Sequence, residues 1–330
     1  MNKKTKYILI TFFTALIAFN GCNDDQNIVI PPSTINDPPP ELPDPPSGWN
    51  YQNSGTIHIL RAVHFIDENT GIAAGYSNTL IRTTNGGTNW NPVNVTGNFT
   101  SISFADKNKG WIAGYSGKTY KTTNAGLSWE EYPSGTGNIL HSIFFLNNST
   151  GWVSGENGCI FKSTNGGMNW FACNNTTYLS IYAVSFLDSS LGWAVGDFGV
   201  LLRTTDGGKY WYQQTYINYL NFYSIFFVNG NGWISSSLND IYMTTNSGSE
   251  WFWTDTGQNL LNDIYFISHQ TGWAVSDNGS VLKSTNGGFN WSVNKGEMES
   301  SLYSVYFVNP NTGWAVGEAG VIIKTTDGGK

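Results

Sequence analysis

The stretch Ser163-Thr164-Asn165-Gly166-Gly167-Met168-Asn169-Trp170 decides the fold, because close copies of it recur along most of the chain. Complete copies also occupy residues 83–90, 122–129, 204–211, 244–251 and 284–291, and a seventh begins at 325 and stops at 330. The tryptophans that end the six complete copies lie 39, 41, 41, 40 and 40 residues apart. A self-similar period of this size is the signature of a repeat architecture. We call each eight-residue copy a box.

A second element precedes each box. It is an aromatic residue followed five to six residues later by glycine, usually as Gly-Trp, for example Phe104 before Gly110-Trp111. In the third unit, short runs rich in aromatic and β-branched residues predict strands near 142–146, 152–155, 159–163 and 170–173. Four strands at a period near 40 are typical of propeller blades.

The two ends of the chain complement each other. Trp49 precedes Phe65 by 16 residues, the interval that also separates Trp129 from Phe145. Residues 48–56 therefore look like an outer strand without its box, and residues 320–330 like a box without its outer strand. Joining them closes the ring and removes free sheet edges. We predict an all-β, seven-bladed β-propeller with four-stranded blades, closed by a blade shared between the N- and C-terminal segments.

Each box contains an Asn or Asp that we expect to fix a turn by accepting a backbone hydrogen bond from two residues further on. The counterpart of Gly167 is glycine in all seven boxes, as expected where φ is positive. A row of carboxylates for metal binding or catalysis is the alternative, but five of the seven residues are Asn. The structural positions are Asn85, Asn124, Asn165, Asp206, Asn246, Asn286 and Asp327.

The N-terminal segment predicts export and a lipid anchor. Lys3, Lys4 and Lys6 precede an apolar run over 7–19, which is short for a membrane span and typical of a signal-peptide core. Residues 1–21 resemble a lipoprotein signal peptide, with Cys22 as the acylated residue. An ordinary secretory signal with a chance cysteine is the alternative. The expected location is a membrane, at the outer membrane or cell surface.

Residues 22–47 hold eight of the eleven prolines and predict an extended tether. A proline-rich recognition motif for a partner is the alternative. Residues 48–330 are then the propeller. We expect it to be a monomer.

Composition limits the function. With Lys+Arg 16 against Asp+Glu 23, the formal charge of −7 argues against a nucleic-acid partner. The four histidines, His58, His64, His141 and His269, show no ligand spacing, so we expect no metal. Every glycine cluster falls in a box or its companion turn, so no phosphate-binding loop and no cofactor are expected.

The run from 312 to 329, with Gly313-Trp314 before the box at Thr325, resembles the photosystem II stability and assembly factor family of propellers. The resemblance covers about 280 residues, and the boxes are similar to the Asp-box or BNR repeat. It implies a non-enzymatic protein-binding or assembly factor, in this chain at the cell envelope. Family members are described as docking through an arginine-rich patch, whereas this chain has only Arg61, Arg82 and Arg203. The last two share a repeat position with lysines and are expected to be structural.

Two other functions remain open. A glycan-binding module would use the same kind of exposed aromatic residues. A sialidase-like glycoside hydrolase would need three converging arginines and paired acidic residues, which three arginines in total do not easily supply. The acids at equivalent places in successive units are expected to belong to turns, so we expect no enzyme. They are Glu156, Asp197, Asp277 and Glu318.

Cys159 and Cys173 flank the turn of the third box almost symmetrically. In a hairpin this spacing suggests cross-strand neighbours within disulfide reach, and export would supply an oxidising compartment. A disulfide is one prediction, and two buried free thiols are the alternative.

The turn between the second and third strands of a blade opens on the same face as the crossovers between blades. These turns vary in sequence while the boxes do not, and recognition is usually built on such variable loops. The alternative is that their aromatic residues only pack the outer strands. The predicted binding face, for an envelope protein or a glycan, comprises Tyr76, Tyr115, Glu156, Asp197, Phe198, Tyr219, Asp277 and Glu318.

Overall fold

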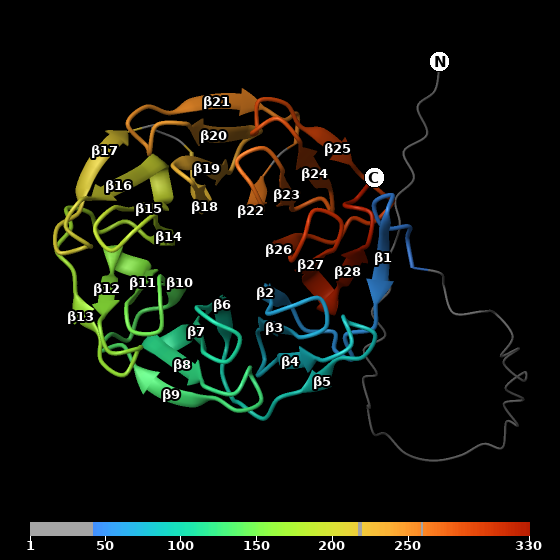
Figure 1. The fold of residues 1–330 in the computed structure, drawn as a ribbon, viewed down its shortest axis with the longest axis horizontal. Coiled ribbons are helices and arrows are strands. Elements are labelled where there is room, and N and C mark those ends of the chain that lie inside the picture. Colours follow the sequence, from blue (N-terminus) through green and yellow to red (C-terminus); the bar gives the residue numbers. More distant parts are fainter. Residues whose placement is uncertain (1–41, 217–219, 259) are drawn as a thin grey trace, which may run out of the picture. The chain divides into compact units, whose positions relative to one another are not determined.

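The computed structural model describes residues 42–216, 220–258 and 260–330. Its strands form seven four-stranded antiparallel sheets arranged as blades around a central axis (Figure 1). The seven-bladed propeller predicted from the repeats is confirmed. The expected signal peptide, the acylated Cys22 and residues 22–41 of the tether lie outside the described residues.

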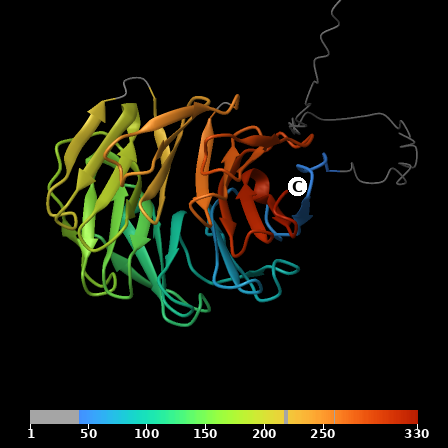
Figure 2. The same ribbon diagram turned by 45° about the horizontal axis from the view of Figure 1, so that its top comes forward.

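Within blades 1 to 6 the strands run in chain order from the axis outward, whereas the outermost strand of blade 7 is the first of the chain; Figure 2 shows the blades obliquely. Blades 1 to 4 are β2 (Leu60–Phe65), β3 (Gly71–Gly75), β4 (Leu80–Thr83) and β5 (Asn91–Pro92); β6 (Phe99–Phe104), β7 (Gly110–Gly114), β8 (Lys118–Thr122) and β9 (Glu130–Pro133); β10 (Leu140–Phe145), β11 (Gly151–Gly155), β12 (Ile160–Ser163) and β13 (Phe171–Ala172); and β14 (Ile181–Phe186), β15 (Gly192–Gly196), β16 (Val200–Thr204) and β17 (Tyr212–Tyr216).

Blades 5 to 7 are β18 (Phe222–Val228), β19 (Asn231–Ser236), β20 (Asp240–Thr244) and β21 (Phe252–Asp255); β22 (Leu261–Phe266), β23 (Gly272–Ser276), β24 (Val281–Ser284) and β25 (Ser292–Asn294); and β26 (Leu302–Phe307), β27 (Gly313–Gly317), β28 (Ile322–Thr325) and β1 (Trp49–Gln52). The helical elements of the described ranges are four 3₁₀ turns, η1 (Tyr115–Gly117), η2 (Glu156–Gly158), η3 (Asp197–Gly199) and η4 (Glu318–Gly320). Among the described residues, no helix is long and apolar enough to cross a membrane.

The ring closes as the termini predicted. β1 pairs antiparallel with β28, with Trp49 opposite Thr325, and the first and last strands lie side by side in Figure 1. Trp49 packs edge-on against Phe307 at 5.8 Å between ring centroids, as Trp170 packs against Phe145 in blade 3. Trp49 is therefore the tryptophan that the seventh box lacks.

Residues 42–47, the last of the predicted tether, belong to the same compact unit as the propeller. The carbonyl oxygen of Asp44 accepts hydrogen bonds from the backbone N–H groups of Glu297 at 2.8 Å and Met298 at 3.0 Å. A Cβ at Gly296 would stand 2.3 Å from the Asp44 oxygen, so this approach requires glycine. The last residues of the predicted tether thus form a strap against blade 6.

The box holds its turn through two side chains. The Asn165 Oδ1 accepts a hydrogen bond from the backbone N–H of Asn169 at 3.0 Å, four residues on rather than the expected two. The Ser163 hydroxyl, which the sequence argument overlooked, accepts the N–H of Gly167 at 2.9 Å and donates to Asn165. The Asp206 carboxylate accepts the corresponding two bonds in blade 4, so an amide oxygen serves as well as a carboxylate oxygen and the box accepts Asn or Asp.

The Gly-Trp tryptophans join successive blades. Trp152 of blade 3 stacks on Phe186 of blade 4 at 3.5 Å, and its indole N–H donates to the Gly207 carbonyl in the next box at 3.1 Å. Trp314 makes the corresponding bond across the seam, to Gly86 at 3.2 Å. Five blades are fixed to the next one by this buried aromatic stack and hydrogen bond. Blade 1 has Ile72 in place of the tryptophan, and in blade 4 Trp193 stacks on Phe227 while its indole N–H has no hydrogen-bond partner.

The expected disulfide does not form in this structure, where both cysteines are free thiols. The hairpin pairs Lys162 with Phe171 and Phe161 with Ala172, so that Cys173 lies opposite Ile160 and not opposite Cys159. An offset of one residue turns the two side chains to opposite faces of the sheet. Each packs against a different apolar cluster, and burial raises the pKa of both thiols to about 11.

Candidate functional site

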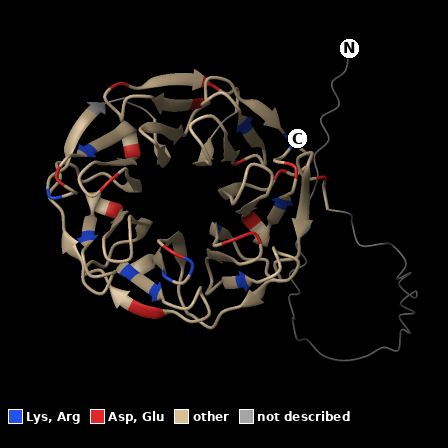
Figure 3. Ribbon diagram, in the orientation of Figure 1, with Lys and Arg blue, Asp and Glu red and all other residues tan. Residues whose placement is uncertain are grey.

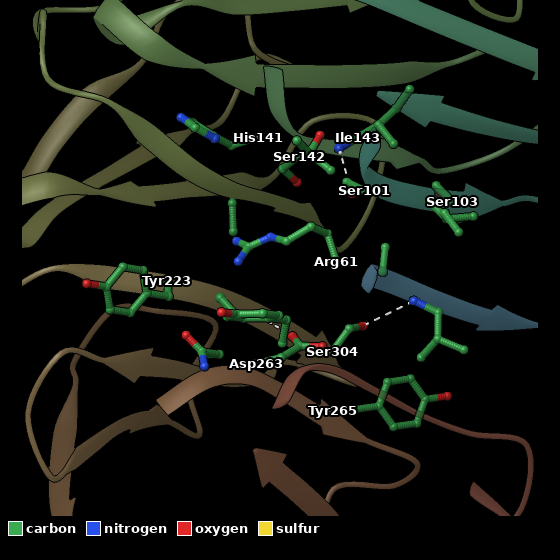
Figure 4. A pocket seen from close by; sticks show the side chains of 18 of the residues that line it. Arg61, Ser101, Ser103, His141, Ser142, Ile143, Tyr223, Asp263, Tyr265 and Ser304 are labelled. Carbon is green, nitrogen blue, oxygen red and sulfur yellow. Dashed lines mark hydrogen bonds between the residues drawn. The ribbon is translucent and has the colours of Figure 1, made fainter. Parts of the chain in front are cut away.

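The innermost strands of all seven blades surround a central cavity of about 660 Å³ (Figure 4). In each of these strands a bulge follows the first residue, as between Leu60 and Ala62 in β2. The bulge allows the second and third residues of the strand both to line the cavity. The fifth residue lines it closer to the box end of the channel in six of the blades.

The side chains form rings at different depths. The second residues form the mouth ring, at the end that carries the variable turns. Its members are Arg61, Thr100, His141, Tyr182, Tyr223, Asn262 and Tyr303. The fifth residues form the base ring, at the box end, with members His64, Ser103, Phe144, Phe226, Tyr265 and Tyr306.

Five of the six base-ring residues carry aromatic rings, and Ser103 is the exception. His64 packs against Tyr306 at 4.4 Å and Phe104 at 5.1 Å between ring centroids, and Tyr265 lies 5.0 Å from both Tyr306 and Phe226. Burial lowers the pKa of His64 to about 3 and raises the pKa of both tyrosines. These groups are therefore neutral near pH 7 and line the channel without adding charge.

Between the rings, Asp263 links three blades. Its carboxylate accepts hydrogen bonds from the Ser224 hydroxyl at 2.8 Å and from the backbone N–H groups of Ile264 at 2.9 Å and Val305 at 3.0 Å. Burial raises its pKa, while these donors oppose the shift. Ser101 accepts the N–H of the next blade from the equivalent position. Asp263 is thus committed to contacts within the propeller.

Arg61 is the only cation among the residues that line the cavity. Its guanidinium carbon lies 4.3 Å from the ring centroid of Tyr303 and 5.9 Å from that of Tyr76. Its buried Nε has no hydrogen-bond partner. Figure 4 shows the side chain reaching into the cavity, on the side of His141 and away from the base residue Tyr265.

Tyrosines and acids complete one side of the mouth. His141 and Tyr182 lie 5.0 Å apart between ring centroids, and Tyr223 lies 5.5 Å beyond Tyr182. Burial lowers the pKa of His141, which nearby Glu156 and Asp197 partly oppose. Burial and a hydrogen bond to Asp197 raise the pKa of Tyr182. Near pH 7 the mouth therefore offers neutral hydroxyl and imidazole groups.

The variable turns do lie beside the crossovers between blades. The first residue of each turn donates its backbone N–H to the crossover that precedes its own blade, as Tyr76 does to Ile59 and Asp197 does to Ser180, both at 3.0 Å. This part of the prediction is confirmed. The use of these turns for binding stays a prediction.

The residues predicted for the binding face take different positions. Tyr76 and Tyr115 pack together at 5.4 Å between ring centroids, and the pKa of Tyr76 is raised to about 12 by burial and then by its hydrogen bond to Tyr115. Phe198 is exposed, with 57% of its surface accessible. Glu156, Asp197 and Asp277 are half-buried and Glu318 is exposed, whereas Tyr219 lies outside the described residues.

The mouth ring was not predicted from the sequence. Arg61, Tyr182 and Tyr303 occupy the second position of the inner strand, where the units differ most, while the next position is Ala, Ser or Asp in every unit. Alignment of the units at this position would have shown the variable ring. No local sequence pattern marks this position, because the ring residues that lie beside it in space are about 40 residues away in the chain.

Other charged groups have structural positions. The repeated basic residues lie at corresponding places in successive blades (Figure 3), opposite the Gly-Trp tryptophans, as Lys162 lies opposite Trp152 and Arg203 opposite Trp193. This agrees with the expected structural role of Arg82 and Arg203. In the described part of the chain, no group of three His, Cys, Asp or Glu residues could hold a metal ion.

Comparisons with known proteins agree on the fold. A structure of YCF48 bound to a D1 peptide has a TM-score of 0.72 and 22% identity, over 86% of this chain and 99% of that one. YCF48 from Cyanidioschyzon merolae has a TM-score of 0.70 and 20% identity, over 84% and 98%. The Niastella koreensis GH74 enzyme has a TM-score of 0.68 and 14% identity, over 84% of this chain but 53% of that one. The search of curated proteins gives no match.

A protein-family model matches the sequence itself. The model described as photosynthesis system II assembly factor YCF48 matches residues 45–173, 173–260 and 252–330, which together span the propeller. The structural likenesses, at these identities, add the fold alone. On the family-model match, the chain belongs to the photosynthesis system II assembly factor YCF48 family.

Proposed function

We propose that this protein is a non-enzymatic binding or assembly factor that holds a protein partner at the mouth of its channel. Membership of the YCF48 family supports this role, and one solved YCF48 structure is bound to a D1 peptide. The observation that carries the proposal is the mouth ring, where tyrosines surround a single arginine above a cavity of about 660 Å³. Tyrosine and arginine are the residues most enriched at the energetic centres of protein interfaces.

Phe198 gives independent support. It stands in the turn between β15 and β16 with a φ of 50°, in the left-handed region that bulky side chains avoid at a cost of about 1–2 kcal/mol. Its ring is largely exposed and adds little to the core. Such an outlier is typical of functional sites, where recognition retains a residue that folding disfavours.

The acidic residues near the mouth make local contacts and are not arranged as a catalytic pair. The Glu156 carboxylate accepts the backbone N–H of Ile139 at 3.2 Å, and Asp197 bonds to Tyr182. These acids are engaged in local contacts, whereas a hydrolase needs two carboxyl groups presented to substrate at a set separation. The arrangement supports a binding protein over a glycoside hydrolase.

We propose in addition that the protein is exported and attached to a membrane by lipid on Cys22. The basic start, the apolar run over 7–19 and the following cysteine support this location. Fractionation of cells that express Cys22→Ser tests it. The variant should leave the membrane fraction, and retention there at wild-type levels would contradict the anchor.

Site-specific photo-crosslinking tests the binding face. A benzophenone amino acid is placed at Phe198 on the mouth face or, as a matched control, at Leu127 in a box, which is 63% exposed at the opposite end of its blade. Irradiation of intact cells should give a discrete adduct with a protein from Phe198 and none from Leu127. Adducts from Leu127 alone would place the binding surface on the box face.

A further inference from the structure

We propose that the mouth contains a carboxylate-binding subsite whose anion receptor is the guanidinium of Arg61. This inference rests on the proposed function and names the chemistry that the mouth would recognise. The two can fail separately, because a partner can dock on the mouth face without placing a carboxylate on Arg61.

Arg61 lacks an anionic partner within the described part of the propeller. Its Nε is buried and makes no hydrogen bond, and in the described ranges the one ion pair joins Lys118 to Glu131. Asp263 is the only acid among the residues that line the cavity, and its carboxylate is already occupied by Ser224, Ile264 and Val305. A partly buried cation with an unused donor is unfavourable in the free protein and is compensated when an anion binds.

The guanidinium of Arg61 is also held in a fixed orientation. The rings of Tyr303 and Tyr76 hold the guanidinium by cation–π contacts, so that it does not have to be ordered when a ligand arrives. A planar guanidinium that keeps unused N–H donors matches a carboxylate in geometry and charge. Tyr182, Tyr223 and Asn262 on the same ring add hydroxyl and amide groups for the rest of the ligand.

The other arginines provide a contrast. The Nε of Arg82 donates to the Ala125 carbonyl at 2.8 Å, which fixes it to the next box. The Nε of Arg203 is also buried without a hydrogen-bond partner, but Arg203 lies over Trp193 at 6.0 Å, at the repeated basic position of its blade, and does not line the cavity. Arg61 alone combines an unused donor with open space.

A carboxylate could come from the end of a peptide chain or from an Asp or Glu side chain. The cavity of about 660 Å³ lies within the range of ordinary ligand pockets, and the base ring lines its box end. Both sources share one chemistry at Arg61, so the experiment carries an arm for each.

Arginine side-chain NMR tests the subsite directly. The sequence has three arginines, so ¹⁵N-labelled full-length protein in detergent should give three Nε–H signals, assigned by Arg61→Lys, Arg82→Lys and Arg203→Lys in turn. The probes are N-acetyl-Ala-Phe-Ala with a free carboxylate, its C-terminal amide, and N-acetyl-Ala-Asp-Phe-Ala amide. Arg82 and Arg203 are internal controls.

The Arg61 signal should move saturably with the free-acid peptide, with the aspartyl peptide, or with both, and not with the uncharged amide. The responding probe identifies the carboxylate source. No saturable movement of the Arg61 signal with either acid, or equal movement with the amide, would overturn the subsite. In that case an unchanged photo-adduct at Phe198 in an Arg61→Gln background would leave the proposed function standing.

Discussion

The two ends of the channel differ in how strictly their residues repeat from blade to blade. At the box end, the units repeat the same hydroxyl, amide or carboxylate, and glycine contacts, five of them add the tryptophan bond to the next box, and the base ring is mostly aromatic and neutral. At the mouth, the equivalent positions differ from blade to blade and include Arg61, which has an unused donor, and Phe198, which is strained and exposed. Repetition marks the part that builds the ring, and variation marks the part that is free to recognise something else.

The comparison yields a general expectation. Changes at the box end or the seam should lower the free energy of unfolding, because they break contacts between blades. Changes at the mouth should leave that free energy nearly unchanged, or raise it, and alter binding.

Removal of residues 46–56 should have the largest effect. It deletes β1 and opens a sheet edge on β28, so the shared blade and the ring closure are lost together. Urea unfolding followed by tryptophan fluorescence should lose its single cooperative transition. Deletion of residues 23–41 is the control and should unfold like the full chain, whereas a cooperative transition after the 46–56 deletion would refute the seam.

Gly288→Ala should destabilise the box end by about 3 kcal/mol, by combining backbone strain with a clash. Its φ is +91°, and a Cβ would stand 2.8 Å from the indole nitrogen of Trp233. Gly287→Ala is the matched control, since Ala125 already occupies the equivalent position in blade 2 with a positive φ. Equal losses of unfolding free energy in urea for the two variants would mean that the tryptophan contact does not set the requirement for glycine.

His64→Phe should make the free energy of unfolding less sensitive to acid, because it removes a buried titratable group. The fold should accept the change, because Phe occupies the equivalent position in blades 3 and 5. The folded state holds the pKa of His64 at about 3, below its ordinary value of 6.5. Its contribution to stability is therefore complete above pH 6.5 and is lost as the pH falls toward 3. Between pH 7 and 4 the wild type should lose about 2 kcal/mol more than the variant, after allowance for channel water. Parallel urea-unfolding curves at all pH values would contradict this.

Phe198→Asn should raise the free energy of unfolding by about 0.5–1 kcal/mol, because Asn tolerates the left-handed conformation better than Phe does. Asn157 occupies the equivalent turn position in blade 3 with a φ of 55°. Urea unfolding gives the measurement, and Phe198→Leu controls for removal of the aromatic ring. A loss of stability in the Asn variant would show that Phe198 serves the fold.

Much of the fold could be predicted because its determinants are local and repeated. The box glycines, the spacing of the tryptophans and the interval from Trp49 to Phe65 were enough to give seven blades and the seam. The tryptophan bonds between blades were not visible, because Trp152 and Gly207 are 55 residues apart. The disulfide prediction failed because symmetry about a turn does not fix the pairing register of a hairpin.

Only part of the candidate site could be predicted from the sequence. The variable turns identified the correct face, since they are contiguous in sequence. The mouth ring is assembled from single residues such as Arg61 and Tyr303, about 240 positions apart, and no local pattern joins them. The unused donor of Arg61 depends on what surrounds it in space, which only the structure provides.

The central claim is that the mouth binds and the box end does not. The most direct test is the dissociation constant of the partner captured at Phe198, measured for two double variants of equal unfolding free energy. Tyr115→Ser with Phe198→Ser changes the mouth face, and Leu127→Ser with Phe289→Ser changes the exposed box face. The account predicts at least about tenfold weaker binding, roughly 1.4 kcal/mol, for the mouth variant and an unchanged constant for the box variant. Weaker binding by the box variant with an unchanged mouth variant would contradict it.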